Sequence, residues 1–318
     1  MEKVNPAMMK GDMCEVVAVA SRTETAARHA ADELGIAKAY GSYEALLADP
    51  EIEAVYNPLP NHLHVPVTKQ AAEAGKHVLC EKPIALSADE ARELIAVRDR
   101  TGVLIQEAFM TRSHPQWLKA RDLVREGAIG DMRAISAVFS YFNDDPGNVR
   151  NMADIGGGAL YDIGCYPITM SRFLFDTEPL RVVGAIERDP EFRTDRLTSV
   201  LIDYPGGQVT FTVSTQLVPY QRVQVLGTKG RIDIEIPFNP APDQPTRISF
   251  DDGSALDGSS AQAIAFDPVD QYTIQGDLFS KAVREGGEQV LSLESSVENM
   301  RIIDAIFRSA SEDRWIDL

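Results

Sequence analysis

Short apolar runs alternate with helix-like stretches through the first 110 residues, and this alternation constrains the fold more than any other feature of the sequence. The runs suit strands, and the stretches between them end at glycines such as Gly35 and Gly75. Strands that alternate with helices form βαβ units and a parallel, doubly wound sheet. The predicted strands are Glu15–Ala20, Ala54–Asn57, His77–Cys80 and Val103–Glu107, and the predicted helices are Thr23–Leu34, Ser42–Ala48, His64–Ala74 and Ser87–Arg100.

The second part of the sequence has a different pattern. Val209, Phe211 and Val213 alternate with polar residues, which indicates an antiparallel sheet with one apolar face and one polar face. Pro205–Gly207 is a hairpin signal, and residues 237–268 read as a loop or hairpin tip. We therefore predict an α/β domain at 1–110, with a Rossmann-like parallel sheet, and an α+β domain at 111–318, with an open-faced antiparallel sheet and helices. The predicted elements of the second domain are helices 115–126, Gln275–Arg284 and Leu293–Ser309 and strands Arg133–Phe142, Val182–Glu187, Thr198–Tyr204, Gln208–Thr215, Val223–Leu226 and Arg231–Ile236.

Composition excludes several classes of partner. The 31 Lys and Arg residues against 48 Asp and Glu residues give a net charge of −17, which disfavours binding to nucleic acid or to an anionic membrane. The longest apolar runs are far shorter than the ~20 residues of a membrane span. Three widely spaced cysteines, Cys14, Cys80 and Cys165, indicate free thiols in a reducing, cytoplasmic compartment.

One expected motif is missing. A dinucleotide-binding domain normally begins with a strand, a Gly-x-Gly-x-x-Gly turn and a helix, and a ribose-reading residue follows about 20 positions later. These 318 residues contain no such turn, yet Glu15–Ala20 followed by Ser21 and Arg22 looks like the second strand of that unit. Met1–Lys10 would be the remainder of the first helix. We therefore expect a shortened chain or a gene model with a late start codon; the alternative is that another segment fills the gap.

Four motifs occur in an order and at spacings that together are specific: Asn57–His62, Glu81–Pro83, Glu107–Gln116 and Gly156–Tyr166. With these motifs the chain resembles the glucose-fructose oxidoreductase, inositol dehydrogenase and MocA family. Within that family, Glu107–Gln116 and Tyr166 look like the branch of dimeric dihydrodiol dehydrogenases and NADP-dependent aldose dehydrogenases. The resemblance implies hydride transfer, and it implies that Pro83 shapes a tight turn, often through a cis peptide bond.

Lys82, Tyr166 and Asp162 are the predicted catalytic residues. Lys82 follows a strand at the carboxyl edge of the parallel sheet, where a partly desolvated lysine can exchange a proton near neutrality. Asp162 and Tyr166 are four residues apart and would share one helix face. We predict that Tyr166 is the acid/base, Lys82 its electrostatic partner and Asp162 the group that orients the substrate. The plainer alternatives are a surface lysine paired with Glu81, and a solvated Asp beside a half-buried Tyr.

Ser21 and Arg22 stand where an acidic residue would bind a free ribose 2′-hydroxyl. A hydroxyl and a guanidinium suit a 2′-phosphate, which favours NADP, with NAD as the alternative. His62 and His64 have no third ligand nearby, so we expect no metal site. His114 would border the substrate or only cap the helix that follows it. The predicted cofactor contacts, several of them implied by the resemblance, are Ser21, Arg22, Asn57, Pro58, Asn61, His62, Glu81 and Lys82, and the predicted substrate contacts are Glu107, Arg112, Asp162 and Tyr166.

The sequence therefore predicts an NADP-dependent oxidoreductase that acts on a C–OH or C=O group of a sugar, cyclic polyol or dihydrodiol. A tightly held cofactor that shuttles hydride between two sugars stays open within this class. Two alternatives of other kinds are a non-catalytic regulatory homologue that senses a sugar or dinucleotide, and a truncated inactive homologue. We also expect a homo-oligomer, a dimer or tetramer formed through the open face of the C-terminal sheet.

Overall fold

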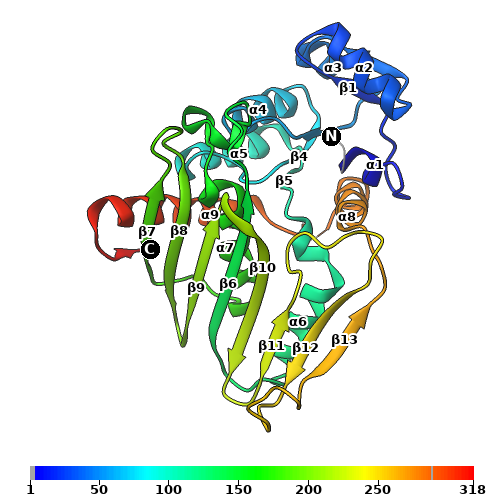
Figure 1. The fold of residues 1–318 in the computed structure, drawn as a ribbon. Helices are drawn as coiled ribbons and strands as arrows, with labels where there is room; N and C mark the ends of the chain where they lie inside the picture. The colour runs from blue at the N-terminus through cyan, green and yellow to red at the C-terminus, as the bar shows by residue number, and fades with distance from the viewer. Residues whose placement is uncertain (1–3, 288) are drawn as a thin grey trace. The chain divides into compact units, whose positions relative to one another are not determined.

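The computed structural model describes residues 4–287 and 289–318. The chain forms two compact units (Figure 1). The first consists of Met1–Ala85, Asp89–Met110 and Asp270–Val297, and the second of Leu86–Ala88, Thr111–Val269 and Glu298–Leu318. No helix in the described ranges is both long enough and apolar enough to cross a bilayer.

The strands of the first unit are parallel, as predicted. Within the described residues they form two separate sheets, β1-β2 and β3-β4-β5, and no strand joins β1 to β3. Strand β2 was not predicted, because three residues that include a lysine carry no strand pattern. The strands are β1 (Ala18–Ala20), β2 (Lys38–Tyr40), β3 (Ala54–Asn57), β4 (His77–Cys80) and β5 (Ile105–Glu107).

Side-chain caps fix the helix ends of the first unit. Thr23 Oγ1 accepts a hydrogen bond from Ala26 N (3.2 Å) at the start of α2. Ser42 Oγ accepts one from Ala45 N (3.1 Å) at the start of α3, and Gly35 ends α2 with a left-handed φ of 70°. These boundaries are the predicted ones. The helices are α1 (Val4–Met8), α2 (Glu24–Leu34), α3 (Tyr43–Leu47), α4 (His64–Glu73), α5 (Ala88–Thr101) and α8 (Gln271–Glu285).

Helix α8 comes from the far end of the chain and belongs to the core of the first unit. Its Phe279 packs in a buried cluster with Met8, Leu79 and Ala108. Helix α1 lies beside α8 (Figure 1), where Thr273 Oγ1 donates a hydrogen bond of 2.7 Å to the carbonyl of Ala7. Helix α8, the first of the two final helices, therefore returns to the start of the fold as predicted, whereas most of α9 belongs to the second unit.

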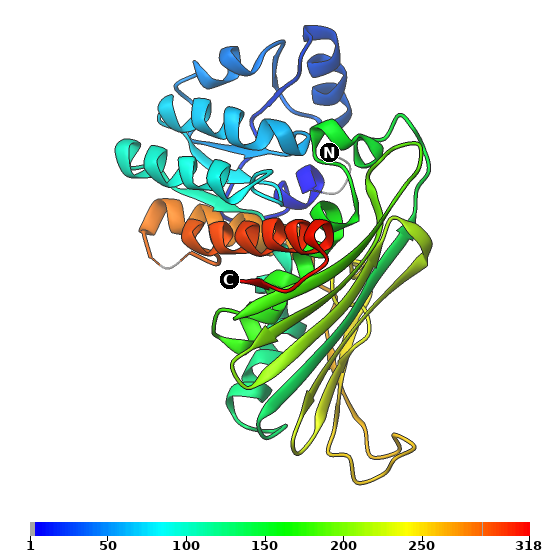
Figure 2. The same ribbon diagram turned by 90° about the vertical axis from the view of Figure 1, so that its left-hand side faces the viewer.

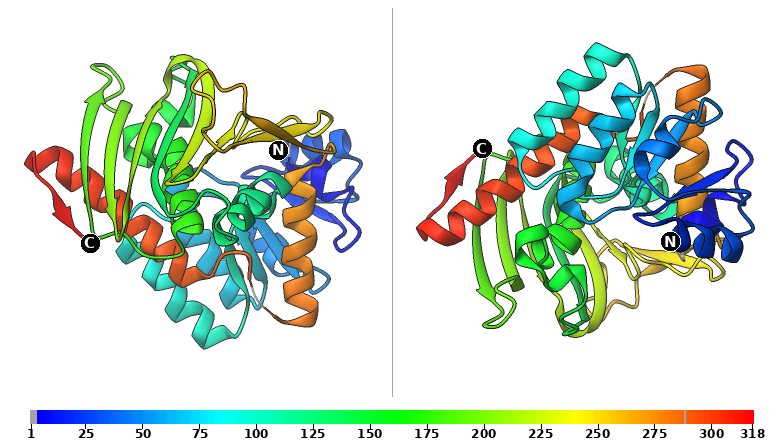
Figure 3. Two further views of the ribbon diagram at one scale, coloured as in Figure 1. Left: turned by 90° about the horizontal axis from the view of Figure 1, so that it is seen from below. Right: turned by 90° about the horizontal axis from the view of Figure 1, so that it is seen from above.

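The second unit contains one large sheet. In the described part of the chain it has nine strands in the order β13-β12-β11-β10-β6-β9-β8-β7-β14. The pairings are antiparallel except for β6 with β9, so the sheet is mostly antiparallel rather than wholly so. The C-terminal strand β14 pairs with β7 (Figure 3). The strands are β6 (Met132–Phe142), β7 (Arg181–Arg188), β8 (Asp195–Tyr204), β9 (Gly207–Ser214), β10 (Gln216–Gly227), β11 (Arg231–Ile234), β12 (Thr246–Asp251), β13 (Gln262–Phe266) and β14 (Ile316–Asp317).

The two faces of this sheet differ as the alternation predicts. Val209, Phe211 and Val213 are buried, whereas Thr210 is exposed. Helices α6 (Pro115–Arg125) and α7 (Cys165–Phe175) and the part of α9 (Leu293–Glu312) that belongs to this unit lie on the apolar side (Figure 2). The opposite face carries no helix of the described chain, which confirms an open-faced sheet.

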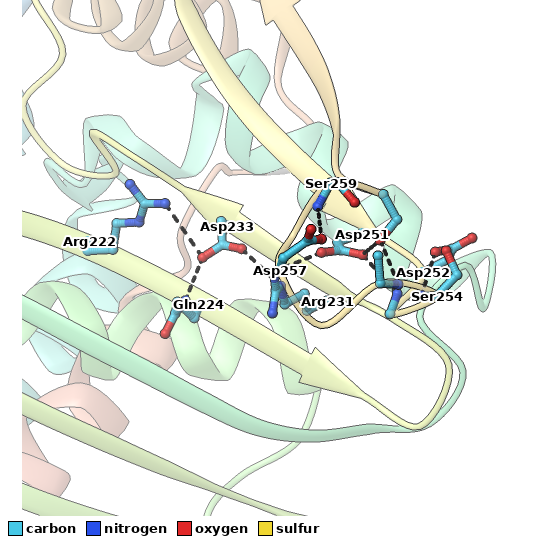
Figure 4. Close-up of polar contacts among 12 residues, drawn as sticks. Arg222, Gln224, Arg231, Asp233, Asp251, Asp252, Ser254, Asp257 and Ser259 are labelled. Carbon is cyan, nitrogen blue, oxygen red and sulfur yellow. Dashed lines mark hydrogen bonds and ion pairs between the residues drawn. The ribbon is translucent and has the colours of Figure 1, made fainter.

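Residues 237–268 contain more structure than a loop. Strands β12 and β13 lie in this segment and pair as an antiparallel hairpin. At its tip, Asp251 accepts hydrogen bonds from Arg231 Nη2 (2.7 Å) and Ser260 Oγ (2.6 Å) (Figure 4). The many Pro, Asp, Gly and Ser residues around these strands form turns. Because they dominate the segment, the short apolar alternation of each strand was not recognised as a strand pattern.

Candidate active site

The carboxyl ends of β3, β4 and β5 bring predicted site residues to one sheet edge. Asn57 is opposite Cys80, and Cys80 is opposite Glu107, in the strand register. Glu81 follows directly, and its N–H donates to the carbonyl of Asn57 (3.0 Å). Doubly wound sheets bind their ligands at this edge.

Two carboxylates hold the turn that carries Lys82. The Lys82–Pro83 peptide bond is cis. Glu107 is 1% exposed and its Oε1 accepts a hydrogen bond from Ile84 N (2.8 Å), while Glu81 Oε2 accepts one from Lys82 N (3.2 Å). The backbone of the turn is thus fixed from both sides of Lys82.

His64, at the start of α4, is a second anchor of this region. Its Nδ1 lies 2.7 Å from the carbonyl oxygen of Pro83, and its Nε2 lies 2.7 Å from that of Leu59. Burial lowers the pKa of His64, although both carbonyls act in the opposite direction. Asn57 Nδ2 donates to the carbonyl of His64 (3.2 Å), so the Asn57 amide is used within the loop. This role of His64 was not predicted, because a link between two loops has no local pattern.

The polar groups of this unit fit a dinucleotide in part. His62 Nδ1 is buried and, within the described residues, has no hydrogen-bond partner, as expected of a group that meets a ligand. Arg22 is exposed just beyond β1, and Ser21 N donates to Tyr40 O (3.0 Å). The sequence holds no glycine turn of the usual pyrophosphate-binding form. The contacts predicted for Pro58 and Asn61 stay predictions.

Asp162 and Tyr166 lie at the start of α7 in the second unit. The structure corrects their predicted spacing on a regular helix, because residues Leu160–Gly164 form a π-helical turn before α7. A Cβ on Gly164 would lie 2.7 Å from Leu160 Cδ1, so a larger residue there would require the Leu160 side chain to move. Single π turns occur often at functional sites.

The Tyr166 side chain is buried rather than half-buried. It is 4% exposed, and its ring packs edge-on against Phe139 and at a tilt against Phe238, with centroids 5.8 Å and 5.3 Å away. The ring is therefore held firmly by aromatic contacts.

The glycines that precede α7 are required by close contacts. A Cβ on Gly157 would lie 2.6 Å from the carbonyl oxygen of Arg150, and one on Gly158 would lie 1.9 Å from Asp195 Oδ1. Gly158 also has a φ of 120°. The glycines let the helix begin against neighbouring groups, as the sequence predicted.

Asp195 supports this helix start from β8. It is 1% exposed and accepts hydrogen bonds from Leu160 N (2.6 Å) and Thr198 Oγ1 (3.1 Å). Burial raises the pKa of Asp195 to about 6. The sequence could not reveal this contact, because 35 residues separate Asp195 from Leu160.

The Asp162 carboxylate has two partners that the sequence did not predict. Tyr141 OH donates a hydrogen bond of 2.6 Å to its Oδ2, and Arg150 Nε lies 2.9 Å from the same oxygen. Asp162 is the largest cause of a raised pKa at Arg150. The carboxylate is therefore fixed by two side chains before any substrate arrives.

Arg112 and His114 have structural contacts in the second unit. The guanidinium of Arg112 lies 4.7 Å from the centroid of the Phe173 ring on α7. His114 Nδ1 accepts a hydrogen bond from Gln116 N (3.2 Å), and burial lowers the pKa of His114 to about 4. The helix-capping alternative for His114 is thus what the structure shows, while the substrate contact predicted for Arg112 stays a prediction.

Family models match most of the chain. Residues 2–109 match the oxidoreductase family with an NAD-binding Rossmann fold, and residues 117–233 match the GFO/IDH/MocA C-terminal domain. The chain belongs to the GFO/IDH/MocA oxidoreductase family. The resemblance inferred from the motifs is therefore confirmed, as is the fold class.

Relatives in this family match over nearly the whole chain. An uncharacterized oxidoreductase of Rhizobium meliloti is 51% identical over 315 residues, which are 99% of this chain and 94% of the relative. D-xylose 1-dehydrogenase (NADP(+)) 2 of Haloferax volcanii is 38% identical, over 96% of this chain and 92% of the relative. The crystal structure of a 3-ketoreductase from Actinomadura kijaniata, with NADP and TDP-benzene, has a TM-score of 0.89 and 28% identity over 96% of this chain and 93% of that one.

Proposed function

We propose that this protein is an NADP-dependent dehydrogenase or reductase that acts on a C–OH or C=O group of a sugar, cyclic polyol or dihydrodiol. Family membership supports hydride transfer. NADP is supported by the relatives that use or bind it and by Ser21 and Arg22, whose hydroxyl and guanidinium suit a 2′-phosphate. A sugar-like substrate is supported by the xylose dehydrogenase among these relatives.

In the proposed mechanism Tyr166 moves the proton. When bound, the nicotinamide accepts or supplies the hydride at its C4 atom. Tyr166 Oη accepts the proton of the substrate hydroxyl in oxidation and returns it in reduction. Lys82 stabilises the phenolate by its positive charge, and Asp162 orients the substrate hydroxyls.

The observation that carries this proposal is the setting of Tyr166. A phenol that is 4% exposed lies at a helix start whose neighbouring carboxylate, Asp162, is held by Arg150 and Tyr141. Buried titratable groups beside fixed charges are typical of catalytic sites.

Kinetics of two variants test the mechanism. We expect Tyr166→Phe and Lys82→Ala each to lower kcat by about 10²- to 10⁴-fold with NADPH or NADP and a panel of aldoses, cyclic polyols and dihydrodiols. Circular dichroism should show both variants folded, and Tyr43→Phe is the matched control. Full activity in both variants would refute the assignment, and tight NADPH binding without any turnover would favour a sensing homologue.

We propose further that the protein forms a homodimer or homotetramer through the open face of the large sheet. Strand β10 supports this, because it carries four exposed large apolar side chains, Leu217, Val218, Tyr220 and Leu226. Light scattering should give a dimer or tetramer, and Val218→Asp should reduce the mass toward a monomer. A cytoplasmic location is supported by the three free cysteines.

A further inference from the structure

A polar cluster surrounds the Asp162 carboxylate in the turn that leads into Tyr166, and two of its members lie outside the motifs that predicted the site. Arg150 belongs to a short 3-10 segment, Val149–Asn151, and Tyr141 to β6. Both contact the same oxygen of Asp162, at 2.9 Å from Arg150 Nε and 2.6 Å from Tyr141 OH. The Asp162 side chain is 14% exposed and the Arg150 side chain 45%, so the carboxylate is shielded from water while the guanidinium is partly exposed.

Hydrogen bonds also hold the backbone of Arg150. Its carbonyl accepts a hydrogen bond from Gly158 N (2.9 Å), and its own N–H donates to Asn148 Oδ1 (3.0 Å). Gly157 lies so close that any Cβ there would clash with the Arg150 carbonyl. The glycine turn before α7 therefore places Arg150 as well as Tyr166.

The charge of Arg150 acts on Tyr166. Asp162 is the largest cause of the raised pKa of Arg150, and Tyr141 and Tyr166 act in the same direction. The interaction between two charges is mutual, so a cation that is favoured by the Tyr166 phenolate favours that phenolate equally. Without Arg150, the Asp162 carboxylate and the Tyr166 phenolate would be two neighbouring anions, and each would oppose ionisation of the other.

We propose that Arg150 is a positioning residue that balances the charge of Asp162 and thereby allows Tyr166 to reach its phenolate form during proton transfer. The inference rests on the acid/base role proposed for Tyr166. The ionisable members of this cluster are Asp162 from the π turn, Arg150 from the 3-10 segment and Tyr141 from β6. The aromatic neighbours of Tyr166, Phe139 and Phe238, do not ionise, and Lys82 adds a positive charge in the proposed mechanism.

The direct test measures ionisation of Tyr166 without substrate or cofactor. The ring carbon bonded to the hydroxyl is labelled with carbon-13 in all nine tyrosines, and the Tyr166 signal is assigned as the one lost in Tyr166→Phe. We expect Arg150→Gln to raise the midpoint of the Tyr166 titration by about one pH unit, and Asp162→Asn to lower it. Arg150→Lys should stay close to the unchanged protein because it keeps the charge.

A matched control and kinetics complete the test. Arg125→Gln removes an exposed arginine that pairs with Asp176 (3.0 Å), and it should leave the Tyr166 titration unchanged. With a substrate, the pH profile of kcat should move upward in Arg150→Gln and return in Arg150→Lys, with little change in KM for the cofactor.

Three outcomes would overturn the inference: equal midpoints in Arg150→Gln and the unchanged protein, equal shifts in Arg150→Gln and Arg150→Lys, or a Tyr166 signal that stays protonated to about pH 11 in the unchanged protein. A titration that shifts as expected in a protein with no turnover would instead refute the proposed function and leave the electrostatic inference standing. Turnover without the shift in the Tyr166 titration would refute the electrostatic inference and leave the proposed function standing.

Discussion

The two units of this protein fix their site residues in different ways. In the first unit, His64 and Glu107 contact the main chain of the loop that carries Lys82, at Pro83 O and Ile84 N. In the second unit, Asp162 is held by the side chains of Tyr141 and Arg150, and Tyr166 by aromatic rings.

The difference follows from the sheets. Strands β3 to β5 have only three or four residues each, so the loops at their ends need contacts to main-chain atoms to keep one conformation. Strands β6 and β8 have 11 and 10 residues, and they present Tyr141 and Asp195 from a continuous sheet. Long strands can position charged and aromatic side chains directly. Short strands position a loop, and the loop then positions the side chain.

The largest expected effect is that of a methyl group at the glycine turn of the second unit. Gly158→Ala should lower the free energy of unfolding by about 3 kcal/mol, because alanine is strained at a φ of 120° and its Cβ would displace the buried Asp195 carboxylate. Gly35→Ala in the first unit is the matched control. Its φ is 70° and a Cβ at this position would meet no atom within 4 Å, so the cost should be about 1 kcal/mol in urea unfolding. Equal costs would contradict the account of the turn.

Asp195 should give the second unit a distinct pH dependence. Its pKa is raised to about 6 by burial, from an ordinary value of 3.8, so the folded state holds a proton that the unfolded state releases. Stability from this group is therefore present below about pH 4 and is lost as the pH rises through about 6, by about 2 to 3 kcal/mol. Asp195→Asn should remove this decline, whereas Asp131→Asn, at an exposed ion pair with Arg133, should keep it. A decline that persists in Asp195→Asn would show that another group causes it.

The smallest effect is expected at the loop anchor of the first unit. His64→Gln loses one of its two close contacts to the carbonyls of Pro83 and Leu59 and should lower the free energy of unfolding by about 1 kcal/mol. His29→Gln, on the exposed face of α2, should change it by less than about 0.5 kcal/mol. Unfolding in urea measures both. If the His64 variant were as stable as the His29 variant, main-chain anchoring would not distinguish the two units.

Local sequence signals predicted most of the fold. Thr23, Ser42 and Gly35 cap helices through contacts within three or four residues, so their roles can be read from the chain. The same holds for the hairpin at Gly206, whose φ is 85°. Strand β2 and the β12–β13 hairpin were missed because their residues carry turn-like composition, and their partner strands supply the pairing.

The sequence predicted only those site residues that stand within recognisable motifs. Tyr166 and Asp162 stand in one glycine-rich stretch, and Lys82 stands in another motif, so a family resemblance finds them. Arg150 reaches Asp162 from a loop, and Asp195 reaches Leu160 from a strand 35 residues away. Such contacts arise from the tertiary fold, and spacing in the sequence does not encode them.

The measurement that tests the central claim most directly is a fluorescence titration of NADPH, with NADH for comparison, into the folded 318-residue chain. The account predicts saturable binding that favours NADPH, and a loss of that preference in Arg22→Ala, because the guanidinium suits the 2′-phosphate. Failure to bind either dinucleotide, or equal binding of both that Arg22→Ala leaves unchanged, would contradict it.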